Sequence, residues 1–237
     1  MQQSFKKLTV SNLSVQYKKK LVLKDINFSI STGQVVGIIG PNGAGKSTLF
    51  KSILGLVPLN DAVILYDNKL LLQQRDKVAY IPQRSQIDWD FPATVWDVVL
   101  MGRICKTGWF KQFSESSYLK VKEALNCLEI SHLKNRRIGE LSGGQQQRVF
   151  LARSIAQEAD IFCLDEPLSG VDYKTQEMIF GLLKNLANDN KLVVVIHHDI
   201  GDALNHFNKL ILLNKSIIAQ GSCNEVLQEH ILYQAYL

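Results

Sequence analysis

The amino-acid sequence predicts an α/β protein whose core is interrupted by a mostly helical insertion, and three observations lead to this prediction. Residues 5–31 alternate apolar and polar side chains, as half-buried strands do. The apolar runs at 161–165 and 192–197 are typical of buried parallel strands. Ahead of these runs, residues 120–130 and 143–157 place apolar side chains three or four positions apart, which is the helical period.

The remaining elements complete this α/β pattern. The β-branched run at 34–39 predicts a strand, and a helix is predicted from Lys46 to about Leu54, with a glycine loop between the two. Further along the chain, we expect a helix near 174–187 and a strand at 209–213.

Composition and charge exclude several classes of protein. With 46% hydrophobic and 21% charged residues, the chain has the composition of a globular protein and not of a disordered one. Its net charge of +5 allows an acidic ligand or a membrane surface as partner but does not require a nucleic acid. The longest apolar runs have five residues, whereas a membrane-spanning helix needs about 20.

The ends of the chain and its cysteines indicate the compartment. No secretory signal is visible at the start, and we expect no appended regulatory domain before the end at Leu237. The four cysteines are far apart and form no CxxC pair, which argues against a structural zinc site or a disulfide framework. This usage is typical of a reducing cytosol.

A glycine-rich loop follows the strand predicted at 34–39. Its residues, GPNGAGKST, fit the pattern G-x-x-x-x-G-K-[ST] and lead into a predicted helix. Unpaired N–H groups at a helix N-terminus attract phosphate, and glycines let the backbone come close. We expect Lys46 to contact the β- and γ-phosphates and the Ser47 hydroxyl to bind Mg²⁺. The predicted phosphate-binding residues are Gly40, Pro41, Asn42, Gly43, Ala44, Gly45, Lys46, Ser47 and Thr48.

A second glycine pair precedes the helix predicted at 143–157. Ser142 is a candidate N-cap in the sequence LSGGQ, and Gly143 and Gly144 clear the space in front of the helix. Taken alone, Ser-Gly-Gly is equally typical of an ordinary turn, so this segment by itself indicates either an anion site or a turn.

Two acidic residues close the apolar strand predicted at 161–165. A carboxylate at the end of a buried strand is costly unless it is paired or bound to a metal. We therefore expect Asp165 to bind Mg²⁺ and Glu166 to act as the general base for an attacking water. The alternative is that both carboxylates lie at a solvated strand end. The presence of Lys46 and Ser47 in the upstream phosphate-binding motif favours the Mg²⁺ interpretation over this alternative.

Together the two glycine loops resemble those of the ATP-binding-cassette (ABC) ATPases. LSGGQ resembles their signature sequence, and GPNGAGKST resembles their Walker A loop. The resemblance implies one P-loop NTPase domain over residues 1–237. It implies a RecA-like parallel-sheet core with an antiparallel β subdomain from residues 1–83 and 159–237, and a helical subdomain carrying the signature from residues 84–158.

The family resemblance also implies a working unit. In ABC ATPases the signature of one copy closes over the γ-phosphate of the ATP held by the Walker A loop of another. This chain has one of each, so the resemblance implies a head-to-tail pair that binds two ATP molecules with Mg²⁺ and hydrolyses them. The implied signature contacts are Ser142, Gly143, Gly144 and Gln145.

Further site residues follow from the resemblance. Gln83 matches the Q-loop glutamine, which contacts Mg²⁺ or water and links the nucleotide to the helical subdomain. Tyr17 matches the aromatic residue that stacks on adenine, with Val22 as a weaker candidate for the same pocket. Residues 169–172 match the D-loop, although Gly170-Val171 departs from the usual residues.

His198 matches the switch histidine near the γ-phosphate. The family usually has Ser-His-Asp at this place, and here the segment reads His197-His198-Asp199. Adjacent residues of a strand point to opposite faces, so we do not expect the two histidines to bind one metal ion. We expect the His198 imidazole to donate a hydrogen bond to the transferring phosphoryl group.

Residues 86–110 indicate what the ATPase drives. They hold all three tryptophans and resemble the branch that serves manganese, zinc or iron importers. The resemblance implies that this segment docks on separate membrane permease subunits at the cytoplasmic face of a bacterial-type membrane. An extracytoplasmic binding protein would deliver the metal, and no nucleic acid is expected as partner. The alternatives are import of another substrate, a non-transport ABC ATPase, or an unrelated P-loop kinase or GTPase.

Overall fold

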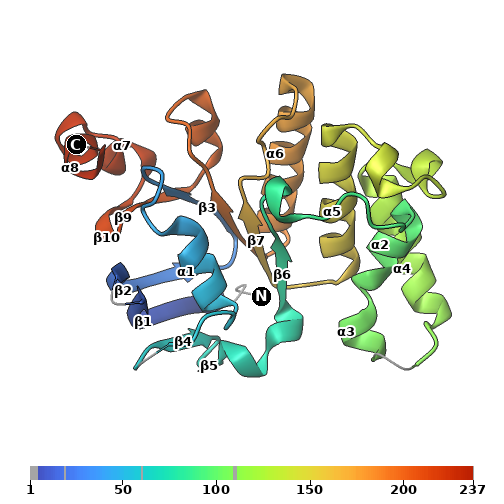
Figure 1. Ribbon diagram of the computed structural model, residues 1–237, viewed down its shortest axis with the longest axis horizontal. Helices are drawn as coiled ribbons and strands as arrows, with labels where there is room; N and C mark the ends of the chain where they lie inside the picture. Colours follow the sequence, from blue (N-terminus) through green and yellow to red (C-terminus); the bar gives the residue numbers. More distant parts are fainter. Residues whose placement is uncertain (1–4, 19, 60, 109–110, 237) are drawn as a thin grey trace.

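The computed structural model describes residues 5–18, 20–59, 61–108 and 111–236 (Figure 1). Trp109 and Phe110, which belong to the predicted docking segment, lie outside these described residues. In the described part of the chain, no helix is both long and apolar enough to cross a membrane.

A four-stranded antiparallel sheet lies at one side of the molecule, with the strand order β2-β1-β4-β5. On β2, the side chains of Ile26, Phe28 and Ile30 are buried, whereas Asn27 and Ser29 are exposed. This is the period-2 pattern predicted for residues 5–31. The strands are β1 (Lys7–Tyr17), β2 (Lys20–Ser31), β4 (Val63–Tyr66) and β5 (Lys69–Leu70).

The second sheet has six strands in the order β10-β9-β3-β8-β7-β6. All neighbouring pairs in it are parallel except β10 with β9. Every residue of β7 and β8 is buried, as expected for central parallel strands. The strands are β3 (Gln34–Ile39), β6 (Val78–Ile81), β7 (Ile161–Asp165), β8 (Leu192–Ile196), β9 (Lys209–Asn214) and β10 (Ser216–Gly221).

Two layers cover the six-stranded sheet. On one face, Val36 and Ile38 pack with helix α1 (Lys46–Ile53) and the antiparallel sheet. On the other face, Val35 and Ile39 join the cluster that includes helix α6 (Tyr173–Asn188). Because side chains alternate along a strand, β3 contributes to both cores and fixes the loop that follows it.

In the described residues between β6 and β7, four helices form the helical part of the molecule, which lies at the opposite end from β9 and β10 (Figure 1). Helix α2 begins at a capping box, in which Thr94 and Asp97 satisfy each other's backbone N–H groups. Helices α2, α4 and α5 share a buried apolar cluster. The four helices are α2 (Val95–Met101), α3 (Ile104–Thr107), α4 (Glu115–Cys127) and α5 (Gly143–Ala156).

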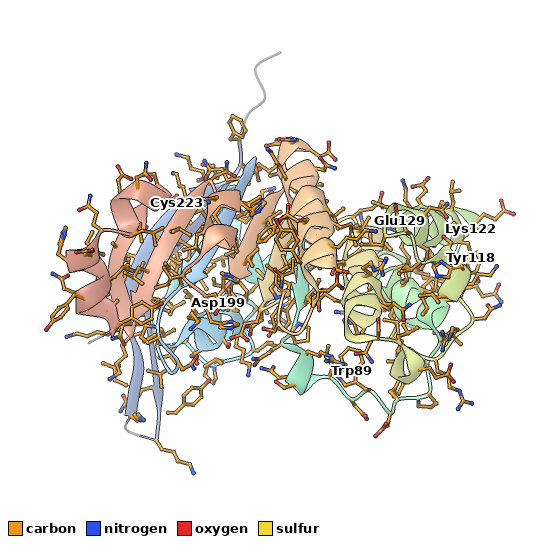
Figure 2. All side chains as sticks on the ribbon, turned by 90° about the horizontal axis from the view of Figure 1, so that it is seen from above. Trp89, Tyr118, Lys122, Glu129, Asp199 and Cys223 are labelled. Carbon is orange, nitrogen blue, oxygen red and sulfur yellow. The ribbon has the colours of Figure 1, made fainter. Side chains whose placement is uncertain are left out.

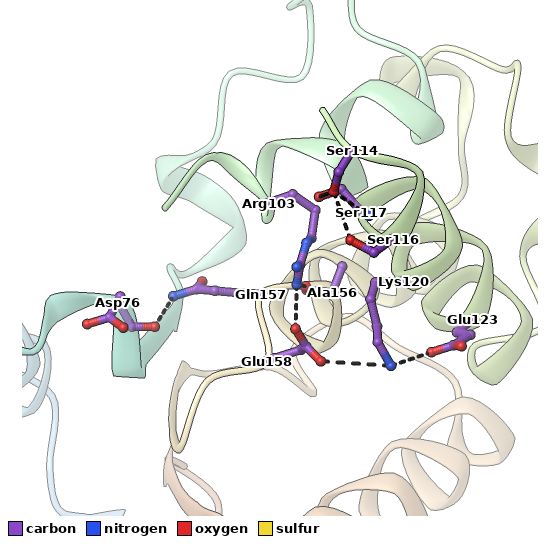
Figure 3. A network of polar contacts seen from close by, with 10 residues as sticks. All are labelled: Asp76, Arg103, Ser114, Ser116, Ser117, Lys120, Glu123, Ala156, Gln157 and Glu158. Atoms are coloured by element: carbon purple, nitrogen blue, oxygen red, sulfur yellow. Dashed lines mark hydrogen bonds and ion pairs between the residues drawn. The ribbon is translucent and has the colours of Figure 1, made fainter. Parts of the chain in front are cut away.

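A polar network joins the end of α5 to its neighbours (Figure 3). Nη1 of Arg103 donates to the Glu158 carboxylate at 2.8 Å, and Lys120 of α4 lies 3.8 Å from the same carboxylate. On the other side, the Gln157 side-chain amide donates to the Val78 carbonyl of β6 at 2.8 Å. The C-terminal end of α5 is thus fixed to both the helical part and the parallel sheet.

Several short elements were not predicted. No strand was assigned at β4, β5, β6 or β10, where two to six residues contain too little periodicity to recognise, and no helix was assigned after residue 213. The C-terminal helices are α7 (Cys223–Val226) and α8 (Glu229–Tyr236). The short 3-10 turns are η1 (Leu71–Gln73), η2 (Arg75–Lys77), η3 (Arg84–Gln86), η4 (Ser131–Leu133), η5 (Ile138–Glu140) and η6 (Asp202–His206).

Candidate functional site

The topology brings four loops to one edge of the parallel sheet. The carboxyl ends of β3, β8, β7 and β6 lie side by side in this order. Ligands of open α/β sheets bind at this edge. The residues that follow these strands are the predicted loop 40–48 after β3, His198 after β8, Glu166 after β7 and Gln83 after β6.

The loop 40–48 requires glycine at two positions where the chain is crowded. Gly40 has φ 148°, and a Cβ there would clash with the Leu213 carbonyl oxygen. Gly45 has φ 98° and its Cβ would lie 2.6 Å from a methyl group of Leu23. The loop therefore fits between β2 and β9 only without side chains at these points.

Lys46 folds back over the loop. Its Nζ donates to the carbonyls of Gly40 at 2.7 Å and Pro41 at 3.0 Å, and the residue is 6% exposed. Burial lowers the pKa of this ammonium, although the carboxylates of Glu166 and Asp165 act in the opposite direction. The result is a cation held in place at the N-terminus of α1.

A cavity of about 270 Å³ lies over this loop. The first turn of α1 faces it without a side-chain cap or an acidic residue, so its N–H groups keep free hydrogen-bonding capacity for an anion. The lining residues are Val22, Asn42, Gly43, Ala44, Gly45, Lys46, Ser47, Thr48 and Glu166.

Asp165 is buried beside this cavity at the end of β7. It is 1% exposed, and neither carboxylate oxygen has a hydrogen-bond partner among the described residues. Burial raises the pKa of Asp165, and the nearby Ser47 hydroxyl offsets this only in part. A buried carboxylate with two unused oxygens, next to a serine hydroxyl, is a donor set that suits Mg²⁺.

The predicted catalytic residues converge on the Glu166 carboxylate. Gln83 Nε2 donates to Oε2 at 2.8 Å, and Nδ1 of His198 lies 3.8 Å from the same oxygen. The Ser169 hydroxyl also donates to it at 3.3 Å. Glu166 has φ 51°, a left-handed conformation that is strained for a non-glycine residue and typical of functional sites.

Ser169 was not predicted as a partner of Glu166. From the sequence it belongs only to the predicted D-loop, and its spacing of three residues from Glu166 does not specify where either side chain points. Asp172, at the end of that segment, caps α6 by accepting from the Thr175 backbone N–H at 3.0 Å. The hydrogen bonds from Thr175 lower the pKa of Asp172.

The histidine pair lies just beyond β8, which ends at Ile196. Strand alternation therefore does not apply to this pair, and the strand predicted at 192–197 is one residue too long. His197 is 5% exposed and His198 has a 42% exposed side chain, so the two still face different surroundings. The described residues contain no group of three or more His, Cys, Asp or Glu side chains that could hold a metal ion.

The signature segment begins α5, away from the loop 40–48. Ser142 is the N-cap, with its Oγ accepting from the Gln145 N–H at 3.3 Å, while Gln145 Oε1 accepts from the Ser142 N–H at 3.0 Å. Residues 142–145 are not among the described residues that line the 270 Å³ cavity. The structure of one chain thus does not bring the two glycine loops together.

Tyr17 and Val22 differ in their placement. Tyr17 ends β1, is 45% exposed and does not line the cavity over the loop, as far as the described residues show. Val22 of β2 does line it, and its carbonyl oxygen would lie 3.1 Å from a Cβ at Gly45. Of the two candidates for the adenine pocket, Val22 was the weaker from the sequence, yet it is the one that lines the cavity over the loop 40–48.

Two tryptophans of the predicted docking segment, Trp89 and Trp96, are half-buried. Trp89 packs edge-on against Phe150 of α5, with ring centroids 5.6 Å apart. Trp96 stacks on Tyr118 of α4 at 6.2 Å and lines a surface hollow. Phe91, between them, is 52% exposed. Part of this segment is therefore core, as the sequence predicts, and part is surface.

Comparison with known proteins identifies the family of this arrangement. The family model of the ABC transporters matches residues 23–169. A protein named as a "probable ABC transporter ATP-binding protein", encoded in the ycf23-apcF intergenic region of Cyanophora paradoxa, is 51% identical over 94% of this chain and 91% of its own length.

Two further relatives carry more specific names. The manganese transport system ATP-binding protein MntB of Listeria innocua is 43% identical, and the alignment covers 97% of this chain and 95% of the relative. The zinc transport system ATP-binding protein TroB of Treponema pallidum is 43% identical, with 96% and 85% covered.

Among solved structures, a metal-chelate type ABC transporter in an inward-facing conformation superimposes with a TM-score of 0.85 at 30% identity, covering 97% of this chain and 88% of that chain. The fold class predicted from the sequence is therefore confirmed. With the family model matching more than half of the chain and relatives above 40% identity covering nearly all of it, this protein belongs to the ABC transporter family as one of its ATP-binding members.

Proposed function

We propose that this ABC protein hydrolyses the ATP that it binds at residues 40–48, as a head-to-tail pair. Lys46 supports the position of the phosphates, because its ammonium is held by two loop carbonyls beside an uncapped helix N-terminus. The β- and γ-phosphates would bind in the cavity that Lys46 lines together with Glu166.

Mg²⁺ fits the residues beside this cavity. Asp165, the Ser47 hydroxyl and Gln83 would hold the ion, and the two unpartnered oxygens of the buried Asp165 carboxylate support this assignment. When bound, Mg²⁺ would neutralise negative charge on the phosphates. Without it, the buried Asp165 side chain costs free energy of folding.

Glu166 is the proposed general base. Its convergence with Gln83 and His198 at the ends of three parallel strands is the observation that carries the hydrolysis proposal. Glu166 would accept the proton of the attacking water, while the Gln83 amide fixes the carboxylate that receives it. His198 would donate a hydrogen bond to the developing charge of the transferring phosphoryl group.

The second copy would supply the signature. Ser142, Gly143, Gly144 and Gln145 lie outside the cavity of their own chain, which supports their use toward the ATP of a partner. ATP then acts by binding the closed pair better than the open one. Tyr17 is the proposed adenine contact, with Val22 beside it.

Transport of a metal ion is the proposed use of this cycle. The MntB and TroB relatives support manganese or zinc as cargo, and iron belongs to the same proposed class. The protein would sit peripherally at the cytoplasmic face of the membrane and dock on permease subunits through residues 86–108. The helices of residues 84–158 would move as a subdomain against the ATP-binding core of residues 1–83 and 159–237.

Replacement of Glu166 by glutamine tests the hydrolysis proposal. Glu166→Gln should bind ATP and form a stable pair, yet release phosphate at least about 100-fold more slowly, because a general base contributes roughly 10²–10⁴-fold. Phosphate release and size-exclusion chromatography with ATP measure the two effects. Hydrolysis at the native rate would show that Glu166 is not the base.

Glu129→Gln is the matched control. Glu129 has nearly the same left-handed backbone, φ 56°, but is exposed in the helical part, at the opposite end of the molecule from Cys223 and away from Asp199 (Figure 2). The same chemical change there should leave phosphate release unchanged.

For the transport proposal, a pull-down from native membranes should recover a polytopic permease, whereas recovery of ribosomes would favour a non-transport ABC ATPase.

A further inference from the structure

Arg84 follows Gln83 and reaches the helix that carries the signature. Its guanidinium donates two hydrogen bonds to Oε1 of Gln146, from Nε at 3.1 Å and from Nη2 at 2.9 Å. Gln146 is the first residue after the pentapeptide 141–145, lies in the first turn of α5 and is 3% exposed. A cationic donor and a buried acceptor thus connect two segments that are 62 residues apart in the sequence.

Gln146 is also fixed from its other side. Its Nε2 donates to the Ile138 carbonyl at 3.1 Å, which determines that the amide oxygen faces Arg84. Its backbone N–H donates to the Ser142 carbonyl at 2.9 Å. A Cβ at Gly143 would lie 3.3 Å from Nη1 of Arg84, so the guanidinium also packs against the signature backbone. The contact with Arg84 therefore orients the first turn of α5.

Neighbouring residues of one loop are bonded to opposite parts of the molecule. Arg84 is fixed to the helical part, since its carbonyl accepts from Trp89 Nε1 at 3.1 Å and its guanidinium lies 5.7 Å from the Trp89 ring. Trp89 in turn packs against Phe150 of α5. Gln83 instead donates to Glu166, at the end of β7 in the parallel sheet.

We propose that Arg84 is a positioning residue that couples Gln83 at the ATP site to the orientation of residues 142–145 through Gln146. This inference rests on the proposed function, in which those residues complete the ATP site of a second copy. A change of partner at Gln83 displaces Arg84, and the bonds to Gln146 carry the displacement into α5 through contiguous contacts. The acceptor is a neutral amide, which holds an arginine less tightly than a carboxylate does, so the contact can form and break during turnover.

Arg84→Met tests the coupling in the full-length protein. Methionine keeps a long side chain but removes every guanidinium donor. We expect kcat, and ATP-driven pairing in the Glu166→Gln background, to fall about tenfold, the loss expected for a hydrogen bond to a charged group. The Kd of the single copy for ATP should change less than about twofold, because Arg84 does not line the cavity at residues 40–48. Arg84→Lys, which keeps one donor, should restore part of kcat.

Gln146→Leu removes the same contact from the other side. It should reproduce the fall in kcat, and the double variant should be no worse than either single variant, because residues that share one contact are not additive. This variant carries the test if Arg84→Met does not fold. Arg136→Met is the matched control, since the Arg136 guanidinium lies at the surface beside Glu140, and it should keep the native kcat.

The inference is overturned if Arg84→Met pairs and turns over at the native rate. It is equally overturned if the Kd for ATP rises as much as kcat falls, because the effect would then be general damage to the ATP site. Native hydrolysis by Glu166→Gln would instead refute the proposed function itself. A slow Glu166→Gln variant together with a native Arg84→Met variant would refute only the coupling.

Discussion

The two glycine-rich loops of this protein both lead into a helix, but they leave the helix N-terminus in opposite states. At α1, the N-cap is Gly45 in a left-handed conformation, and no side chain caps the first turn. At α5, Ser142 and Gln145 form a capping box and satisfy each other's backbone N–H groups. At the first helix no side chain competes with an anion for the N–H groups, whereas at the second the capping box already satisfies those of Ser142 and Gln145.

This difference indicates how a shared ATP site can be divided between two copies. The loop at α1 has a fixed ammonium and free N–H groups, so it can bind phosphate within one chain. The loop at α5 uses the Ser142 Oγ as the acceptor of its cap, which leaves the hydroxyl proton to donate to a ligand from outside the chain. One loop would thus hold the nucleotide continuously, and the other would engage it only in the closed pair.

Among the variants that test this difference between the loops, Lys46→Ala should have the largest effect. The substitution removes the cation and frees the carbonyls of Gly40 and Pro41 that Lys46 now holds. We expect the Kd for ATP to rise roughly 10- to 100-fold, since hydrogen bonds to charged groups contribute about 1.5–3 kcal/mol. Isothermal titration calorimetry measures this change. Lys184→Ala, an exposed lysine of α6, is the control, and an unchanged Kd for Lys46→Ala would contradict the phosphate assignment.

Much of this arrangement was predictable from local sequence. The loop 40–48 and the pair Asp165-Glu166 each follow an apolar strand and carry a short motif, so their positions at the sheet edge follow from chain order alone. Gln83 was predictable only through resemblance, because β6 has four residues and gives no periodic signal of its own.

Long-range contacts were not predictable in the same way. The bonds from Ser169 to Glu166 and from Arg84 to Gln146 depend on side-chain directions that no spacing specifies. Val22 ranked below Tyr17 because aromatic character is visible in a sequence, whereas the approach of β2 to Gly45 is a property of the assembled fold.

The glycines of the two loops should differ in their effect on stability. Gly45→Ala places a side chain at φ 98° and against Leu23, so we expect the free energy of unfolding to fall by about 1–3 kcal/mol. Gly144 is helical and a Cβ there meets Thr175 only at 3.5 Å. Gly144→Ala should therefore keep the stability or raise it by up to about 1 kcal/mol.

Thermal or urea unfolding measures both variants, and ATP-driven pairing adds a second readout. Gly144→Ala should pair more weakly despite its intact fold, because the proposed role of Gly144 is to let a partner's phosphate approach. Equal losses of stability in the two variants would contradict the difference between the two loops. Native pairing by Gly144→Ala would show that close approach of a phosphate does not require glycine at this position.

Ser142→Ala is expected to destabilise the protein less than Gly45→Ala does, and it separates the two roles of a capping residue. Loss of the Oγ acceptor for the Gln145 N–H should lower the free energy of unfolding by about 1 kcal/mol. Ser222→Ala removes the N-cap hydroxyl at α7, which donates to the Glu225 carboxylate at 2.9 Å, and should cost a similar amount. Only Ser142→Ala should also lower ATP hydrolysis, because only its hydroxyl has a proposed phosphate partner in the second copy. Unfolding curves and phosphate release are therefore measured on both variants. They distinguish a residue that only caps a helix from a residue that caps a helix and also binds the ATP of the second copy. Equal hydrolysis by the two variants would show that Ser142 only caps its helix.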